Sequence, residues 1–343
     1  MISLFDRSST ESRALLAGGA PVFLLVNPVE YHGPHLSLHN DHLISLGFVR
    51  EVHARLVARR PEHPLIVAAD LEVGVDPVPG PGTRAISYAQ VRALVVRACL
   101  ALAELGARRV VLMTFHGSPL HNAALHAGVR ALAGRGIPAL APLNEILHQQ
   151  IDFDDALRAQ FAPAVAHLPS DAERAAVLTE IPFDFHAGFV ETSLSLHFEP
   201  QSVSPDYRRL PPCPAPRPSA PVLALGGLFQ RLGLERLARE LRFAAHGLGW
   251  YALRPFPGYT GRPALATAEV GALFAAAIAD RMAARAEAVL FENAPPPLPV
   301  MSYLRWLSLG GRVSQAGIPL EQIGLPISRA PDPARSSSPA PSP

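Results

Sequence analysis

The sequence contains no lysine among its 343 residues, so arginine supplies all the positively charged side chains other than histidine. This absence excludes enzymes that form a Schiff base on a lysine and proteins that hold nucleotides with a P-loop lysine. The formal net charge is only +1, which provides no basic surface of the kind that binds nucleic acid or an anionic membrane. We therefore expect neither partner.

Cysteine is scarce as well, with Cys99 and Cys213 the only two. They make no disulfide framework and no paired-cysteine metal site, which fits a reducing cytoplasm. The first residues lack the basic start and apolar core of a signal peptide. Charged residues such as Arg97 and Glu104 interrupt the long apolar runs before they reach the ~18 residues that cross a membrane. The sequence thus predicts a cytoplasmic protein.

The amino-acid composition and the positions of the Pro-rich segments indicate one main domain. An apolar content of 49% and a charged content of 17% are typical of a globular protein with an ample core. We expect a short N-terminal arm or helix at 1–20, a single domain at 21–310, and a disordered Pro/Ser-rich tail at 330–343. Within the domain, the Pro-rich segment 202–221 is expected to be an irregular excursion outside the core.

Apolar runs of strand length alternate with helical stretches along the first half of the chain. The expected strands are 22–26, 64–69, 109–115 and 137–143, and the expected helices are 43–58, 87–105 and 119–133. Leu94 is expected to face inward from the second of these helices. This alternation predicts an α/β fold, with a mostly parallel sheet and helices on both faces. Further helices are expected at 223–246, with Leu228 and Leu232 on its apolar stripe, from 267 to about 286, and at 301–309.

The segment 28–42 concentrates ionisable side chains directly after the first expected strand. Glu30 and His32 are two residues apart, so extended backbone would direct both to one face. Asp41 lies nine residues after His32, and a Gly-Pro turn between them could bring it back over both. Oxygen and imidazole ligands together suit zinc, manganese or iron. His35, His39 and His42 are equally well explained as solvated or supporting groups.

Two later segments carry similar side chains. His116 stands just past the expected strand 109–115, and ligands bind at the carboxyl ends of strands in open α/β sheets. His186 and Glu191 flank a glycine, with Thr192 or Ser193 able to orient Glu191, although an ordinary helix start would look the same. The Pro/Gly-rich loop 75–83 is either a wall of the substrate pocket or a surface turn. His121 and His126 are expected to be structural.

These motifs together resemble the creatininase family of metal-dependent amidohydrolases, over about residues 20–290. The family's opening signature, Glu-x-His-Gly-x-His-Leu with an Asp nine residues after the first His, is matched by residues 30–36 and Asp41. Its Pro-Gly-Thr loop is similar to residues 81–83, its Gly-His-Gly segment to 115–117, and its His-Ala-Gly-x-x-Glu-Thr-Ser block to 186–193. A late Gly-x-x-Gly-x-Pro block and the Ala-Thr that follows it resemble residues 258–271.

The resemblance implies a three-layer α/β/α sandwich with two divalent metal ions, zinc being favoured over manganese or iron. It implies that Glu30 and His116 serve one metal, His32 the other, and that Asp41 bridges them. A family glutamate two residues after the strand-end histidine is Ser118 here, so Glu191 is expected to replace it and to act in catalysis. His186 would donate the proton to the leaving nitrogen. The expected substrate-binding residues are Tyr31, Gly82, Thr83, Gly117 and Ser118.

The expected function is hydrolysis of a non-peptide C–N bond, such as a cyclic amide or formamide, by a metal-bridging water. A small-molecule amide would be the substrate, and the family resemblance implies a homo-oligomer, a hexamer. Residues beside His116 depart from the family pattern, as Thr114-Phe115 and Ser118-Pro119, which changes the pocket and puts creatinine in question as the substrate. Processing of a modified precursor peptide is an alternative, as is a catalytically inactive scaffold on the same fold.

Overall fold

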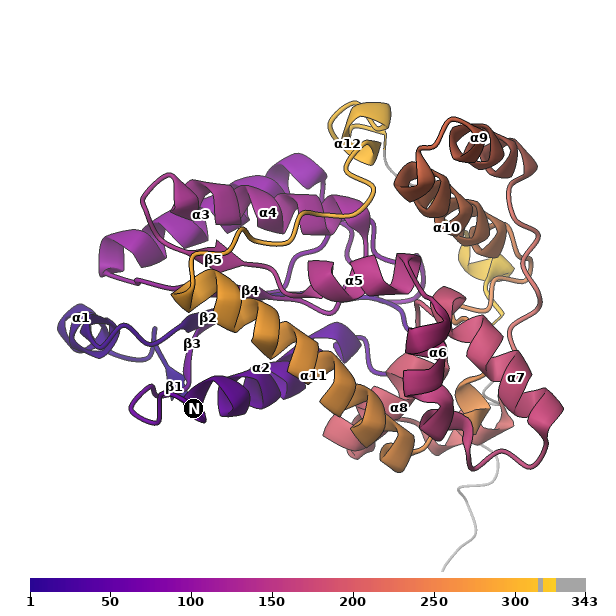
Figure 1. Cartoon of the computed structure of the whole chain (residues 1–343), viewed down its shortest axis with the longest axis horizontal. Coiled ribbons are helices and arrows are strands. Elements are labelled where there is room, and N and C mark those ends of the chain that lie inside the picture. Colours follow the sequence, from indigo (N-terminus) through magenta and orange to yellow (C-terminus); the bar gives the residue numbers. More distant parts are fainter. Residues whose placement is uncertain (314–316, 325–343) are drawn as a thin grey trace, which may run out of the picture.

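The computed structural model describes residues 1–313 and 317–324. The predicted disordered tail at 330–343 lies outside the described residues. Within them, the chain forms a parallel sheet with helices packed on its two faces (Figure 1).

The sheet has five strands in the order β1-β3-β2-β4-β5, and every neighbouring pair is parallel. The strands are β1 Ile2–Ser3, β2 Val22–Val26, β3 Ile66–Leu71, β4 Val110–Met113 and β5 Ala139–Leu140. The four predicted strands are therefore confirmed. The fifth, β1, comes from the predicted N-terminal arm, which adds an edge strand beside β3 before α1 begins.

Twelve α-helices are found among the described residues. Those around the sheet are α1 Ser9–Ala17, α2 Asn40–Val57, α3 Tyr88–Leu105, α4 Pro119–Ala133 and α11 Ala268–Phe291. The remainder are α5 Leu143–Ile151, α6 Asp155–Phe161, α7 Asp171–Glu180, α8 Phe189–Phe198, α9 Ala220–Arg231, α10 Glu235–Tyr251 and α12 Leu304–Leu307. Among these residues, every helix is too short or too polar to span a lipid bilayer.

Alternate side chains of the central strand β2 are buried in two separate hydrophobic cores, one on each face of the sheet. Phe23 and Leu25 pack with α2, α8 and α11, whereas Val22, Leu24 and Val26 pack with α1, α3 and α4. A strand buried on both faces in this way has to be continuously apolar, as β2 is. The result is the predicted three-layer α/β/α arrangement.

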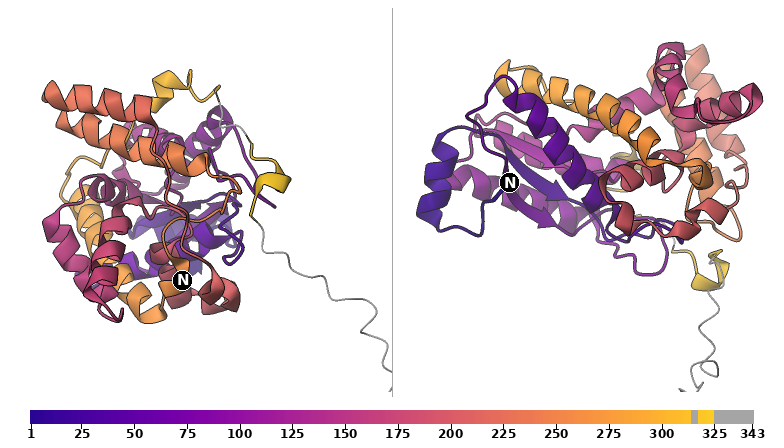
Figure 2. Two further views of the ribbon diagram at one scale, coloured as in Figure 1. Left: turned by 90° about the vertical axis from the view of Figure 1, so that its right-hand side faces the viewer. Right: turned by 90° about the horizontal axis from the view of Figure 1, so that it is seen from below.

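Helices α5 to α10 gather beyond one end of the sheet, on the right in Figure 1. The long helix α11 extends past the sheet toward this end, as Figure 2 also shows. The strands are parallel, so their carboxyl ends share one edge, and the polar segments after β2, β3 and β4 are thereby brought together.

The prediction of one helix over 223–246 was wrong. The chain forms two antiparallel helices, α9 and α10, because residues 232–234 turn sharply between them, with Gly233 at φ +75°. Leu228 is 51% exposed and Leu232 is 63% exposed, so this part of the leucine stripe does not enter the core. Leu94, expected to face inward from α3, is likewise 43% exposed.

The Pro-rich segment 202–221 is irregular, as predicted, apart from a short 3-10 helix at Pro205–Arg209 and the start of α9 at its end. It is not wholly outside the core, however. Val203 and Tyr207 are buried in the cluster formed by α2, α8 and α11, and the Tyr207 hydroxyl donates to the Ala266 carbonyl oxygen at 3.2 Å. These contacts fix the segment against the domain.

Candidate metal centre

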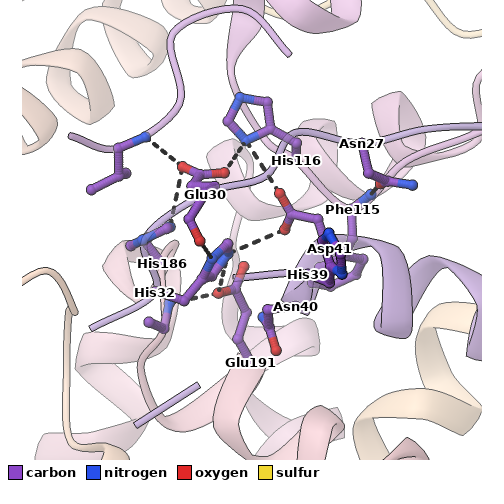
Figure 3. A network of polar contacts seen from close by, with 12 residues as sticks. Asn27, Glu30, His32, His39, Asn40, Asp41, Phe115, His116, His186 and Glu191 are labelled. Atoms are coloured by element: carbon purple, nitrogen blue, oxygen red, sulfur yellow. Dashed lines mark hydrogen bonds and ion pairs between the residues drawn. The ribbon is translucent and has the colours of Figure 1, made fainter. Parts of the chain in front are cut away.

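Six ionisable side chains from three parts of the chain meet at the carboxyl edge of the sheet (Figure 3). Each is at most 7% exposed. They are Glu30, His32 and Asp41 after β2, His116 after β4, and His186 and Glu191 before and within α8. All five predicted metal ligands and the predicted proton donor therefore lie in one cluster.

A sharp turn after His32 folds the chain back toward the sheet. Gly33 adopts φ +66°, a left-handed conformation that glycine tolerates best. The chain then enters α2, which places Asp41 in the first helical turn. Glu191 likewise lies in the first turn of α8. Both carboxylates thus sit at helix N-termini, where the helix dipole favours negative charge.

Asp41 lies between two histidines, with one carboxylate oxygen toward each. Its Oδ1 is 3.2 Å from His32 Nε2, and its Oδ2 is 3.6 Å from His116 Nδ1. Glu30 Oε2 lies 2.8 Å from the same His116 nitrogen. Glu191 Oε2 lies 3.9 Å from His32 Nε2. The cluster therefore divides into two donor sets that share Asp41.

Backbone groups fix which ring nitrogen each histidine turns to the cluster. His116 Nε2 donates to the Val75 carbonyl oxygen at 2.9 Å, which leaves Nδ1 facing the carboxylates. His32 Nδ1 donates to the Glu30 carbonyl oxygen at 3.1 Å, which leaves Nε2 facing them. Hydrogen bonds of this kind set the tautomer and orientation of metal-binding histidines.

The carboxylates are held in the same way. The Val78 N–H donates to Glu30 Oε1 at 2.6 Å, and the Ala187 N–H donates to Glu191 Oε2 at 2.5 Å. Glu191 is therefore held by the backbone, and the expectation that Thr192 or Ser193 would hold it was wrong. The Thr192 hydroxyl instead pairs with His35 Nε2 at 2.9 Å.

Mutual attraction keeps the cluster ionised in spite of its burial. Burial would raise the pKa of Glu30, but His116, His32 and the Val78 N–H lower it to about 2. Burial would lower the pKa of His32, but Asp41, Glu30 and Glu191 raise it to about 10. His116 follows the same pattern, with Glu30 and Asp41 raising its pKa to about 9. Such shifts arise where buried charges have been assembled for a purpose.

The cluster fits divalent metal ions. Asp41 Oδ2 is buried, and no described residue donates a hydrogen bond to it, a condition that is costly unless a cation is bound there. One ligand atom each from Glu30, His32 and Asp41 lies within 4.8 Å of the others, and the same holds for His32, His186 and Glu191. Burial raises the pKa of Glu191, and the neighbouring Asp41 raises it further, although His32 acts in the opposite direction. A bound cation would therefore be needed to keep Glu30, Asp41 and Glu191 ionised together.

His186 differs from the other two histidines because it is held uncharged. Burial and the neighbouring His32 lower its pKa well below the usual value. Its Nε2 donates to the Tyr31 carbonyl oxygen at 2.9 Å, so Nδ1 carries the lone pair. That nitrogen lies 3.9 Å from Glu30 Oε1. His186 is thus positioned to take up a proton, or to bind a metal, on the side of the cluster.

A cavity of about 820 Å³ adjoins the cluster, and Glu30, His116, His186 and Glu191 form part of its wall. Of the five predicted substrate-binding residues, Gly117 and Ser118 line it. The Ser118 hydroxyl also accepts a hydrogen bond from the His121 N–H and so caps α4.

Tyr31, Gly82 and Thr83 do not line this cavity, and they shape the backbone behind the cluster. Thr83 Oγ1 accepts from the Tyr31 N–H at 2.9 Å and donates to the Val78 carbonyl oxygen at 2.7 Å. The loop 75–83 thereby places the Val75 carbonyl oxygen against His116 and the Val78 N–H against Glu30. Asp76 of this loop lines the cavity, so the loop is partly a pocket wall, as one of the two expectations had it, and it also supports the cluster directly.

The other histidines of the opening segment stay outside the cluster. The side chain of His39 is half exposed, and His42 pairs with Asp70 at 2.8 Å. His35 is buried and contacts Thr192, as noted above. His121, expected to be structural, is buried with Nε2 3.2 Å from the Val26 carbonyl oxygen, and burial and His116 lower its pKa to about 3.

Two supporting residues were not anticipated. Asn27 Oδ1 accepts hydrogen bonds from Ser45, Thr114 and the Phe115 N–H, which ties the end of β2 to the end of β4. Asp184 accepts from the Val190 N–H and from Thr260, and so positions the start of α8. The only signal for Asn27 was its place at a strand end, and Asp184 had none.

Comparison with known proteins agrees with this geometry. The family model "Creatininase: Creatinine amidohydrolase" matches residues 6–286. The solved structures described as "Creatininase Mn" and as "creatinine amidohydrolase (creatininase)" are each 22% identical with TM-scores of 0.52. The alignments cover 84% of this chain and, respectively, 100% and 97% of theirs. A creatininase mutant described as the Zn-Zn type is 21% identical with a TM-score of 0.52, covering 85% of this chain and 100% of that one.

No curated protein matches the sequence. The likeness to the solved structures establishes the fold, and the family model spans most of the chain, including every residue of the cluster. This protein therefore belongs to the creatininase (creatinine amidohydrolase) family.

Proposed function

We propose that the protein is a two-metal amidohydrolase that cleaves a C–N bond outside peptides. The observation that carries the proposal is the position of Asp41, with one carboxylate oxygen toward His116 and the other toward His32. Glu30, His116 and Asp41 would hold one ion, and His32, Asp41 and Glu191 the other. Three protein ligands with an open position are typical of catalytic sites.

Two divalent ions, when bound, would supply Lewis acidity toward the amide carbonyl and an activated water. The remaining chemistry falls to the protein. An amide nitrogen is a poor leaving group until it is protonated, so a proton carrier has to stand beside it. His186 fits this role, because its uncharged Nδ1 can take a proton from the attacking water and pass it to the leaving nitrogen.

The donor atoms support zinc first, with manganese or iron as alternatives, since three carboxylates and two imidazoles suit each of these ions. One solved structure in this family is described as containing manganese and another as the Zn-Zn type. For this chain the metal is a proposal.

A small amide is favoured over a precursor peptide. The cavity beside the cluster is lined mainly by apolar side chains, and an extended peptide backbone would need a series of hydrogen-bond partners there. One creatininase mutant is described as complexed with creatine, which shows a small ligand in that relative. Incubation with candidate peptides and small amides, followed by mass spectrometry, distinguishes the two substrate classes.

The proposal is tested first by metal analysis of protein purified without chelator. We expect close to two equivalents of transition metal per chain. A content well below one equivalent, with no activity recovered on adding zinc or manganese, would refute the proposal and favour an inactive scaffold.

We also propose that the protein is a homo-oligomer. Several leucines of the α9–α10 hairpin are large and exposed, including Leu228, Leu232 and Leu234. Large apolar side chains exposed close together in the sequence are favourable to bury against a second copy. Light scattering coupled to size exclusion should therefore give a mass that is a multiple of 36.6 kDa.

A further inference from the structure

The cavity beside the metal ligands is much larger than a small cyclic amide requires. Its volume is about 820 Å³, whereas an apolar cavity of about 150 Å³ is enough to hold benzene. Because Glu30, His116, His186 and Glu191 belong to its wall, it is continuous with the proposed catalytic centre. A group attached to the reacting amide would therefore have room to extend into it.

The wall beyond these four residues is predominantly apolar. Six of its large side chains are Phe115, Leu147, Phe161, Phe185, Phe243 and Met301. They come from segments far apart in the sequence, and residues of α10 and α12 also line the cavity. Burying an apolar group against such a wall is favourable by about 25 cal/mol per Å² of area removed from water.

Arginine and lysine partners for an anionic substituent are nearly absent, whereas Asp76 and Asp184 also line the cavity and would repel an anion. Arg254 is the only arginine among the described residues that line the cavity, and the chain has no lysine. Its guanidinium is already bonded to the Gln322 side chain and to the carbonyl oxygens of Tyr251 and Leu253. A phosphate or carboxylate on the substrate would therefore lose its hydration without gaining a free cation.

Part of this wall lies outside the region that defines the family. The family match ends at residue 286, whereas Val300, Met301, Leu304 and Leu307 line the cavity. The size and apolar character of the cavity therefore depend partly on residues that the family model does not cover.

We propose that the substrate is an amide that carries a large apolar group, such as a medium-length alkyl chain or a ring system, which the cavity holds. This inference rests on the proposed amidohydrolase function only for the nature of the reacting bond. The apolar group could be attached on the acyl side or on the nitrogen side of that bond, and the experiment separates these two arrangements.

The test uses alkyl hydroxamates, whose head groups bind metal ions, and each titrated sample is checked by mass spectrometry for intact hydroxamate. One series carries chains of two to ten carbons on the acyl side, and a second carries the same chains on the nitrogen of N-hydroxyformamide. Titration calorimetry with the zinc-loaded, full-length protein should show the Kd falling about fourfold for each added methylene in at least one series, until the cavity is filled. A Kd that does not change with chain length in either series would overturn the inference.

Two glycines provide a matched pair of variants. Gly247 in α10 lines the cavity, and Gly227 in α9 is exposed and does not. A Cβ atom at either position meets no atom within 4 Å, and both lie inside helices where leucine is a better helix former than glycine. Gly247→Leu should reduce the preference for ten-carbon over two-carbon hydroxamates at least tenfold, whereas Gly227→Leu should leave it unchanged. Equal effects of the two substitutions would contradict the assignment of the cavity.

Hydrolysis of primary amides and N-formyl alkylamines of the same lengths separates this inference from the proposed function. If affinity rises with chain length but no amide is cleaved, the cavity inference stands and the amidohydrolase proposal fails. If short amides are cleaved while affinity and kcat/KM are independent of chain length, the amidohydrolase proposal stands and the cavity inference fails.

Discussion

At the scale of single residues, Asp41 is the side chain that makes one cluster out of two donor sets. Its oxygens lie 3.2 Å from a His32 nitrogen and 3.6 Å from a His116 nitrogen, and no other described carboxylate contacts both histidines so closely. Because Asp41 lies in the first turn of α2, the same residue links the cluster to the helix that packs against the sheet.

Glu191 is the residue on which the second donor set depends. Without it, His32 and Asp41 would be the only ligands from the first segment, and stable binding usually needs three. Glu191→Gln keeps the size of the side chain but removes its charge, so we expect one of two metal equivalents to be lost, with at least 100-fold lower turnover. Plasma mass spectrometry of the purified variant measures the metal.

Ser118 provides the control for this substitution. It occupies the position of the missing family glutamate, but its hydroxyl caps α4. Ser118→Ala should retain both metal equivalents. If Glu191→Gln kept two equivalents and full turnover, Glu191 would not be a ligand.

His186 should behave in the opposite way, because it is proposed to move a proton. His186→Gln removes the group that titrates but keeps a side chain able to contact the Tyr31 carbonyl oxygen. We expect both metals to be retained and kcat to fall by roughly 10²–10⁴-fold, the usual contribution of a general acid–base group. Loss of one metal equivalent would instead assign His186 as a ligand with His32 and Glu191.

The sequence allowed the members of the cluster to be predicted but not the groups that orient them. Glu30, His32 and Asp41 are close in sequence, and the polar residues after β2 and β4 had to meet at one sheet edge. The partners of Glu30 and His116 are backbone groups of Val78 and Val75, in a loop whose path depends on the packing of the whole domain. No side-chain pattern identifies such groups.

At the scale of elements, Asp41 and Glu191 lie in the first turns of α2 and α8, and the start of α8 is tightly packed. A Cβ atom on Gly188 would lie 1.5 Å from Asp184 Oδ1, so no larger residue fits there. Asp184 in turn accepts a hydrogen bond from the Val190 N–H at 2.8 Å. The position of Glu191 thus depends on a glycine and a buried aspartate that do not themselves belong to the cluster.

Gly188→Ala should therefore displace Asp184 and disturb the start of α8. We expect the free energy of unfolding to fall by about 2 kcal/mol or more, and the metal held by Glu191 to be bound more weakly. Thermal denaturation followed by circular dichroism, together with metal analysis, measures both effects. Gly227→Ala, made inside α9 where a Cβ meets open space, should leave metal binding unchanged and should not lower the free energy of unfolding, because alanine is the better helix former. An unchanged melting temperature for Gly188→Ala would show that Asp184 can move freely.

Elements were predicted well where a terminus had its own chemical signal. Ser87 and Gly106 cap α3 at the expected residues, and Pro119 begins α4. The α9–α10 hairpin was missed because leucines continue at helical spacing through the turn, and Gly233 alone does not distinguish a break from a tolerated glycine. Which of those leucines are buried depends on neighbours that the local sequence does not specify.

At the scale of the whole molecule, the sheet and the outer helices have separate tasks. The sheet edge carries the clustered ionisable side chains, and the helices gathered beyond it provide much of the apolar wall of the cavity. The sequence indicated the first, since strand ends are local features. It did not indicate the second, because the wall combines side chains from residues 115 to 318.

The cluster should also make the stability of the whole molecule depend on metal. A ligand that binds only the folded chain stabilises it by RT ln(1 + [L]/Kd), which is about 4 kcal/mol at a free concentration 1,000 times the Kd. Removing the ions leaves three buried carboxylates near one another, with Asp41 Oδ2 lacking any hydrogen-bond donor among the described residues. We therefore expect a chelator to lower the melting temperature by at least about 5 °C, and added zinc or manganese to restore it. Asp41→Asn, which weakens both donor sets, should show almost no response to chelator, and Glu191→Gln an intermediate one. A protein that contains metal by analysis but melts at the same temperature after its removal would show that the ions contribute nothing to the fold.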